Sequence, residues 1–292
     1  MKNINSIVLG FARYSGMYGV NSKSYIKTKV INTILKNKKI DQIDTAISYK
    51  IANKKLSQID TKKFKVCSKI PFYDLGSYRI EKKIFYDVKK HLNFIKKKKL
   101  EVLYLHDPSM LFNKNRNILI KILKKLKSNK IIKKIGFSVY SPDELNSLLK
   151  IYRPDVVQIP VNIFDRRFLK KSLLNKLKKK NISIYLRSIF LQGILLKNIK
   201  ELPKFFYRWK NLFYNWEKWL KKNKISKVEG CLSILNTVNA KINLIIGVEN
   251  PKQLEEILRL IDTKINPPKN IFSNNEILVN PSQWKLKSRN FK

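Results

Sequence analysis

Residues 155–188 read DVVQIPVNIFDRRFLKKSLLNKLKKKNISIYLRS and contain a strand, a helix and a second strand in succession. The runs DVVQIPVN from Asp155 and SIYLRS from Ser183 are short and rich in β-branched residues, as buried strands are. Between them, LLNKLKKKN places leucines at helical spacing, with lysines on the opposite face. This succession predicts a parallel βαβ unit.

The same alternation extends over the whole chain of 292 residues. Lysine-rich amphipathic segments separate the apolar runs, and eight strands alternating with eight helical positions favour a closed (β/α)8 barrel over a doubly wound sheet. No change in composition marks a linker, so residues 1–292 are expected to form a single domain. The other six predicted strands are SIVLGFA from Ser6, DQIDTA from Asp41, FKVCSK from Phe64, EVLYLHD from Glu101, KKIGFSVY from Lys133 and NLIIGV from Asn243.

Two segments depart from the βα repeat. Residues 197–224, after the seventh strand, contain KFFYRWKNLFYNWEKWL, whose apolar residues recur at spacings of three and four. This spacing predicts a helix packed on the barrel, although basic and aromatic residues together could also stack nucleotide bases, or the segment could form a lid. Residues 263–292 form a tail in which Trp284 either closes over a pocket or packs on the barrel wall.

The charge of the chain is extreme, with 63 Lys and Arg against 20 Asp and Glu and a formal net charge of +43. Such a balance is typical of proteins that bind nucleic acid or anionic membranes. Only 10 of the basic residues are Arg, however, and the lysines accompany abundant Ile and Asn, as an AT-rich coding sequence would produce. We therefore expect neither a nucleic-acid nor a membrane partner.

Cysteine content and the chain start indicate the compartment. Cys67 and Cys231 are too few for a disulfide framework and belong to no metal-ligand motif, so no metal is expected. The first residues carry only a short apolar run, interrupted by Gly10 and Arg13, and no stretch is long enough to span a membrane. We expect a cytoplasmic protein.

Polar residues close several of the predicted strands. Asp44 ends the second strand with Tyr49 in the following loop, Lys69 ends the third, and His106 ends the fourth. In a parallel barrel the carboxyl ends of the strands meet at one mouth, where active sites lie. Each residue alone is open to an ordinary structural interpretation, but the four together predict a site. The other histidine, His91, lies in a lysine-rich helix and is expected on the surface.

The residues at these positions resemble the aldo-keto reductases. LGFARYSGMYGV is similar to the first-strand motif of a bacterial branch of predicted aldo-keto oxidoreductases, and DTAISY is similar to the family signature DTA-x-x-Y. Later blocks resemble the family in the same order: KVCSK, LYLHDP, GFSVYSPDEL, VVQIPVNIFDRR, LRSIFLQGILL and IIGVENPKQLEEI. The resemblance implies an NAD(P)H-dependent oxidoreductase that reduces an aldehyde or ketone, including sugar-derived carbonyls.

The resemblance also implies a catalytic tetrad of Asp44, Tyr49, Lys69 and His106. Tyr49 would protonate the carbonyl oxygen, and an adjacent ammonium would lower the pKa of its phenol, which is ordinarily about 10. Lys69 would supply that ammonium, Asp44 would hold it, and His106 would hydrogen-bond the substrate oxygen.

Cofactor positions carry over in the same way, with NADP(H) and NAD(H) both left open. Ser138, Gln158 and Asn162 would hold the nicotinamide carboxamide. Arg187, Ser188, Leu191 and Gly193 would follow the nicotinamide ring and pyrophosphate. Gly247, Gln253 and Glu256 would lie near the adenosine, and Tyr14 and Phe112 are candidates for the substrate pocket.

The chain departs from the family pattern beside the tyrosine. The usual glycine and glutamate are Lys50 and Asn53 here, and the asparagine that often follows the carboxamide serine is Val139. These changes leave the tetrad intact but alter the loop that carries Tyr49. An alternative function is therefore a non-catalytic nucleotide-binding barrel that serves as a regulatory or assembly subunit.

Overall fold

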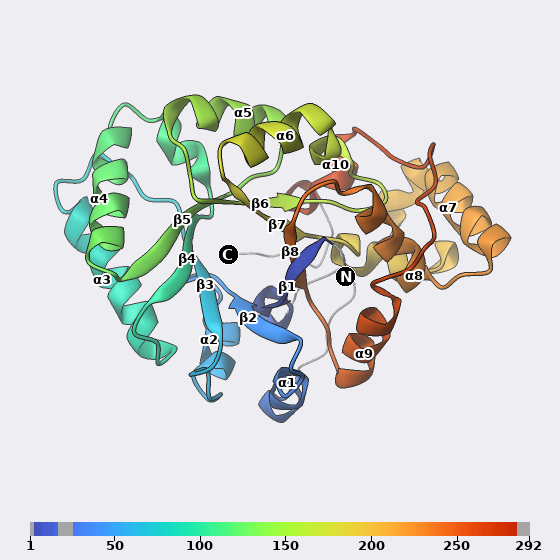
Figure 1. The fold of residues 1–292 in the computed structure, drawn as a ribbon, viewed down its shortest axis with the longest axis horizontal. Helices are drawn as coiled ribbons and strands as arrows, with labels where there is room; N and C mark the ends of the chain where they lie inside the picture. Colours follow the sequence, from blue (N-terminus) through green and yellow to red (C-terminus); the bar gives the residue numbers. More distant parts are fainter. Residues whose placement is uncertain (1–2, 17–25, 285–292) are drawn as a thin grey trace.

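Eight parallel strands close into a barrel at the centre of the molecule (Figure 1). The computed structural model describes residues 3–16 and 26–284. Each strand pairs with its neighbours in sequence, and β1 pairs with β8 to complete the ring. The strands are β1 Ile4–Gly10, β2 Ile40–Asp44, β3 Lys65–Ile70, β4 Leu100–Leu105, β5 Ile132–Ser138, β6 Val156–Pro160, β7 Ser183–Arg187 and β8 Ile242–Ile246. The predicted (β/α)8 fold is confirmed.

Side chains fill the interior of the barrel. Tyr104 and Tyr185 meet edge to face inside it, with ring centroids 6.1 Å apart. Tyr104 needs a glycine on the neighbouring strand, because a Cβ on Gly136 would lie 2.4 Å from the tyrosine ring. A packed barrel of this kind leaves its chemistry to the loops at the strand ends. The other apolar residues of this inner cluster are Val8, Cys67, Val102, Val156 and Ile245.

Helices surround the barrel and bury their apolar faces against it (Figure 1). Ser141 and Asn250 cap α5 and α9, each accepting a backbone N–H three residues later, and each is followed by proline. The helices between strands are α1 Thr28–Leu35, α2 Lys50–Leu56, α3 Ile80–Phe94, α4 Arg116–Ser128, α5 Pro142–Ile151, α6 Lys171–Lys179 and α8 Lys227–Leu232, with α9 Pro251–Leu260 after the last strand.

The expected surface position of His91 is wrong. Its side chain is only 5% exposed, and its Nε2 lies 2.9 Å from Oγ of Ser68 on β3. In α3, His91 continues the buried line of Ile80, Ile84 and Val88, so the helix turns it inward despite the lysines beside it.

The segment after β7 is helical and buries its apolar face, as its spacing predicted. Short 3-10 helices at Ile199–Glu201 and Lys204–Trp209 lead into α7, Lys210–Asn223. The apolar residues that recur at spacings of three and four face inward. Trp209 is partly buried against the core, and four are buried: Phe206, Phe213, Trp216 and Leu220.

The tail that begins at residue 263 packs against this segment through Trp284. After the short helix α10, Glu276–Val279, Trp284 lies edge-on to Phe206 with ring centroids 4.8 Å apart, and its indole N–H donates to the Leu278 carbonyl. Trp284 is therefore buried against the segment that follows β7. Among the described residues, no helix combines the length and apolar character needed to cross a membrane.

Candidate active site

The mouth at the carboxyl ends of β2, β3 and β4 brings together the four predicted tetrad residues. Asp44 is the last residue of β2, Lys69 the next to last of β3, and His106 directly follows β4. Tyr49 immediately precedes α2. Parallel pairing of these neighbouring strands places their ends side by side, although 62 positions separate Asp44 from His106 in the sequence.

Lys69 and Asp44 form a buried ion pair. The Lys69 Nζ lies 2.5 Å from Asp44 Oδ2, and the two side chains are 3% and 7% exposed. The ammonium also donates to the Thr45 carbonyl at 2.9 Å, and the second Asp44 oxygen accepts from Gln158 Nε2 at 2.9 Å. Burying two charges is costly unless their polar atoms are satisfied, and these additional bonds satisfy them. The pair is therefore held in one arrangement.

Tyr49 and His106 lie next to this pair. Their rings meet edge to face with centroids 6.0 Å apart, and the Lys69 Nζ is 5.8 Å from the centroid of the Tyr49 ring. Burial, together with the positive charges of Lys69 and Arg187, lowers the pKa of His106 to about 4. The imidazole is thus neutral at physiological pH, with one nitrogen as donor and the other as acceptor.

Three residues predicted to hold the carboxamide lie across the mouth from Tyr49. Ser138 ends β5, Gln158 is its register partner within β6, and both are buried. The Gln158 amide nitrogen is bound to Asp44, which connects this side to the tetrad. Asn162 is fully buried; its Oδ1 accepts two backbone N–H groups, while its Nδ2 has no hydrogen-bond partner within the described residues. An unpaired buried donor of this kind is costly unless a ligand satisfies it.

The turn after β7 has an unusual backbone. Ser188, Leu191 and Gln192 have φ values of 67°, 44° and 53°, and Gly193 has 85°. Positive φ at three residues other than glycine within five positions stores strain, which in proteins clusters at ligand sites. Arg187 holds this turn against the β5 loop, donating to the Val139 carbonyl at 3.1 Å and stacking 4.5 Å from the Tyr140 ring.

The residues predicted to lie near the adenosine form a separate group at and after the end of β8. The Gln253 side chain accepts the Glu249 backbone N–H at 2.8 Å, which fixes the start of α9. Glu249 pairs with Arg13 of the β1 loop at 2.5 Å. Gly247 packs against the Arg13 side chain, and Glu256 is half-buried on α9. Sequence reasoning missed the Arg13–Glu249 pair, since nothing local connects residues 236 positions apart.

The two pocket candidates occupy different environments. Phe112 ends a short 3-10 helix after β4 and is 49% exposed, so it is available to a ligand. Tyr14 is 1% exposed and packs edge-on against Phe11, with a ring-centroid distance of 5.0 Å. Its hydroxyl has no hydrogen-bond partner in the part of the chain that the structure describes. Both assignments stay predictions.

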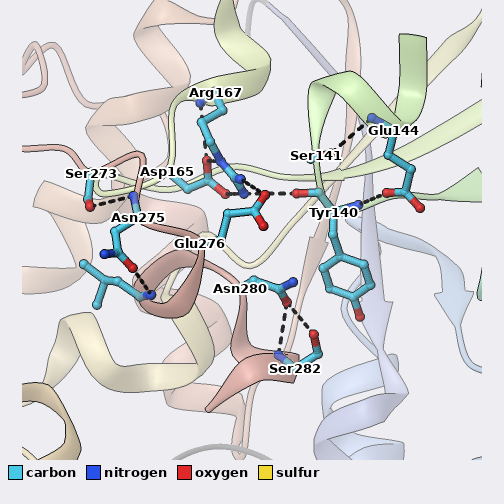
Figure 2. Close-up of polar contacts among 11 residues, drawn as sticks. Tyr140, Ser141, Glu144, Asp165, Arg167, Ser273, Asn275, Glu276, Asn280 and Ser282 are labelled. Carbon is cyan, nitrogen blue, oxygen red and sulfur yellow. Dashed lines mark hydrogen bonds and ion pairs between the residues drawn. The ribbon is translucent and has the colours of Figure 1, made fainter. Parts of the chain in front are cut away.

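Arg167 connects the β5 and β6 loops with the tail, a link that sequence reasoning did not identify (Figure 2). Its guanidinium binds both oxygens of Asp165, donates to the Tyr140 carbonyl and pairs with Glu276 of α10 at 3.0 Å. Since Asp165 also donates its backbone N–H to Asn162, the tail is tied to the loop that carries the unpaired amide. The only sequence signal was the adjacent pair of arginines, Arg166 and Arg167, after a strand.

The remaining candidate chemistry is limited. Cys67 and Cys231 are free thiols, and both are buried. Within residues 3–16 and 26–284, no group of three or more His, Cys, Asp or Glu side chains could hold a metal ion.

Comparisons with solved structures show the same fold in several proteins. The glycerol dehydrogenase AKR11B4 from Gluconobacter oxydans is 18% identical, with a TM-score of 0.66, over 89% of this chain and 87% of that one. The holo form of the aldo-keto reductase AKR11C1 from Bacillus halodurans is 15% identical, with a TM-score of 0.68, over 90% and 88%. A comparison with curated protein sequences gives no significant match.

A family model provides the assignment that these distant structural similarities cannot. The model described as the aldo/keto reductase family matches residues 6–270, which include every strand of the barrel from Ser6 onward and all four tetrad positions. The chain therefore belongs to the aldo/keto reductase family.

Proposed function

We propose that the protein reduces an aldehyde or ketone to the alcohol with NAD(P)H, using Tyr49 as the proton donor. Membership of the family supports an oxidoreductase that acts on carbonyl compounds. The observation that carries the finer proposal is the buried Asp44–Lys69 ion pair beside Tyr49 and His106. Sugar-derived carbonyls are included in the proposed substrate class.

Tyr49 is a suitable acid only because of its neighbour. A phenol with an ordinary pKa of about 10 releases its proton reluctantly near neutral pH. An ammonium favours the ionised form of a phenol beside it, and Lys69, held by Asp44, places that positive charge next to the Tyr49 ring. Tyr49 Oη then gives its proton to the carbonyl oxygen as negative charge develops there.

His106 stabilises the same oxygen without competing for the proton transfer. Because burial holds its pKa at about 4, its ring is neutral and donates one N–H hydrogen bond. A neutral donor fixed beside Tyr49 orients the carbonyl and stabilises the charge that develops on its oxygen.

The polar groups on the other side of the mouth fit a nicotinamide cofactor, which when bound supplies a hydride to the carbonyl carbon. The buried Asn162 Nδ2 offers a free donor for the carboxamide oxygen, and Ser138 and Gln158 are register partners on the neighbouring strands β5 and β6. Arg187, Ser188, Leu191 and Gly193 would follow the ring and pyrophosphate, with Gly247, Gln253 and Glu256 toward the adenosine. The two unpaired cysteines agree with a cytoplasmic location.

Substitution of Tyr49 tests the proposal directly. Purified protein should oxidise NADPH or NADH in the presence of a panel of aromatic aldehydes and sugar carbonyls, followed by nicotinamide absorbance. Tyr49→Phe should lower kcat by roughly 10²-fold to 10⁴-fold while cofactor binding, measured by fluorescence, is retained. The matched control is Tyr152→Phe, because Tyr152 follows α5 at the opposite end of the barrel and should not affect turnover.

Two outcomes would redirect the assignment. Equal rates in wild type and Tyr49→Phe would overturn the role of Tyr49. Tight cofactor binding without turnover on any member of the panel would instead assign the alternative, a non-catalytic nucleotide-binding barrel.

A further inference from the structure

Asn53 lies in α2 but bonds mainly to the loop before that helix. Its side chain is 3% exposed. Its Oδ1 accepts from the Thr45 hydroxyl at 2.8 Å, and its Nδ2 donates to the carbonyls of Ala46 at 2.9 Å and Ile47 at 3.4 Å. One buried amide therefore contacts three consecutive loop residues.

That loop carries the contacts which position Lys69. The Thr45 carbonyl accepts from the Lys69 ammonium at 2.9 Å, and the Ile47 N–H donates to the Lys69 carbonyl at 3.0 Å. The residues that Asn53 holds are thus the ones that bind Lys69 through both its side chain and its backbone.

The same loop positions Tyr49. The Tyr49 N–H donates to the Ala46 carbonyl at 3.0 Å, and the Tyr49 carbonyl accepts the Asn53 N–H at 2.8 Å. Asn53 therefore bonds through its backbone to Tyr49 and through its side chain to the turn on which Tyr49 depends. Any shift of this turn moves Tyr49 and the acceptor of Lys69 together.

An amide is the group that fits these three partners. The site requires one acceptor for a hydroxyl and donors for two carbonyls, which Asn supplies from a single short side chain. A carboxylate supplies acceptors only, and buried here it would face two carbonyl oxygens with no proton to offer them. Asn53 occupies the position where the resemblance to the family predicts glutamate. At this position the Asn53 amide satisfies all three of its polar neighbours.

We propose that Asn53 is a positioning residue for the tetrad: it holds the Thr45–Ser48 loop so that the Tyr49 hydroxyl and the Lys69 ammonium keep their mutual placement. This inference rests on the proposed function for its consequence in catalysis. The contacts of Asn53 with the loop do not depend on that function, and both parts can be measured separately.

Asn53→Asp is the sharpest test, because it preserves shape, removes both donors and adds a buried negative charge. We expect kcat to fall roughly 10-fold to 100-fold, as small displacements of catalytic groups do, with substrate KM and the cofactor Kd within about 2-fold of wild type. Proton donation by Tyr49 depends on the charges around its hydroxyl, so the pH profile of kcat should also differ from that of wild type.

Asn236→Asp is the control for the loss of amide donors at an exposed loop. Asn236 also donates from one amide nitrogen to two loop carbonyls, Thr263 at 2.9 Å and Ile265 at 2.8 Å, but it precedes β8 at the far end of the barrel. It should change Tm and leave the pH profile of kcat unmoved. If Asn53→Asp does not fold, Thr45→Val is the second variant. It removes only the hydroxyl that donates to Asn53 Oδ1, and it should lower kcat by a smaller factor.

The outcomes separate this inference from the proposed function. An Asn53→Asp enzyme with a lower Tm but the wild-type kcat and pH profile would overturn the positioning role. If the wild type proves inactive, hydrogen exchange of residues 45–50 still tests the contacts: exchange should be faster in Asn53→Asp than in Asn236→Asp, and equal exchange would overturn the proposal.

Discussion

The two histidines of this chain share one property and differ in nearly every other. Burial lowers the pKa of each to about 4, so both rings are neutral at physiological pH. His106 lies at the mouth of the barrel beside Tyr49. His91, on α3, faces the outer side of β3 and is hydrogen-bonded to Ser68. A lowered pKa therefore indicates that each ring is buried, but it does not by itself identify a functional histidine. The groups that each ring faces distinguish the two sites.

A single step along β3 separates the two environments. Ser68 and Lys69 are consecutive, and because side chains alternate across a strand, one points out toward α3 and the other in toward the mouth. Ser68 satisfies a buried ring, while Lys69 supports the proposed acid. Substitutions at the wall, defined by Ser68 and His91, should thus change stability. Substitutions at the mouth, defined by Lys69 and His106, should change turnover.

The largest expected effect is on turnover, from His106→Ala. Loss of a donor aimed at the developing oxyanion should lower kcat by roughly 10²-fold to 10³-fold. Steady-state kinetics on a substrate found in the carbonyl panel would measure it. His91→Ala is the paired variant: once corrected for the folded fraction, its kcat should match wild type, and an equal loss in both would remove the distinction between the two sites.

The next largest effect is the pH dependence of the free energy of unfolding that His91 causes. The unfolded ring has a pKa of about 6.5 and the folded ring about 4, so between these values the unfolded state binds the proton first. Stability from the neutral ring is complete above about pH 6.5 and is lost as pH falls toward 4. Between pH 7 and pH 5 the loss should be about 2 kcal/mol.

Urea denaturation of wild type and His91→Leu at the two pH values measures this difference. His106 is present in both proteins, so its own titration cancels in the comparison. If both proteins lost the same free energy of unfolding between pH 7 and pH 5, His91 would not be a source of the acid sensitivity.

How much of this arrangement sequence reasoning can reach depends on how local the signal is. The strands and the placement of Asp44, Lys69 and His106 followed from apolar runs that each end in a polar residue, which is information within a few positions. The barrel predicted on that basis and the family predicted from the resemblance are both confirmed. The roles of the tetrad residues stay predictions, although the structure brings the four together.

The features that escaped prediction depend on geometry instead. The burial of His91 had a signal that we did not weigh, its position three residues after Val88 on an apolar helix face. The Arg13–Glu249 pair had none, since the two residues meet only when β1 and β8 close the barrel. The bonds of Asn53 depend on which carbonyls a tight turn presents, and no residue pattern encodes that directly.

The smallest expected effect tests the wall itself, through Ser68→Ala. The substitution leaves the His91 Nε2 buried without the hydroxyl that now lies 2.9 Å away, and an unsatisfied buried polar atom costs about 1–3 kcal/mol. The free energy of unfolding at pH 7 should fall by an amount near the lower end of that range, because the small cavity lets the ring shift. The kcat should not change, since Ser68 points away from the mouth. A fall in kcat would mean that the position of Lys69 depends on the outward contact of its neighbour, and that wall and mouth are one cooperative unit.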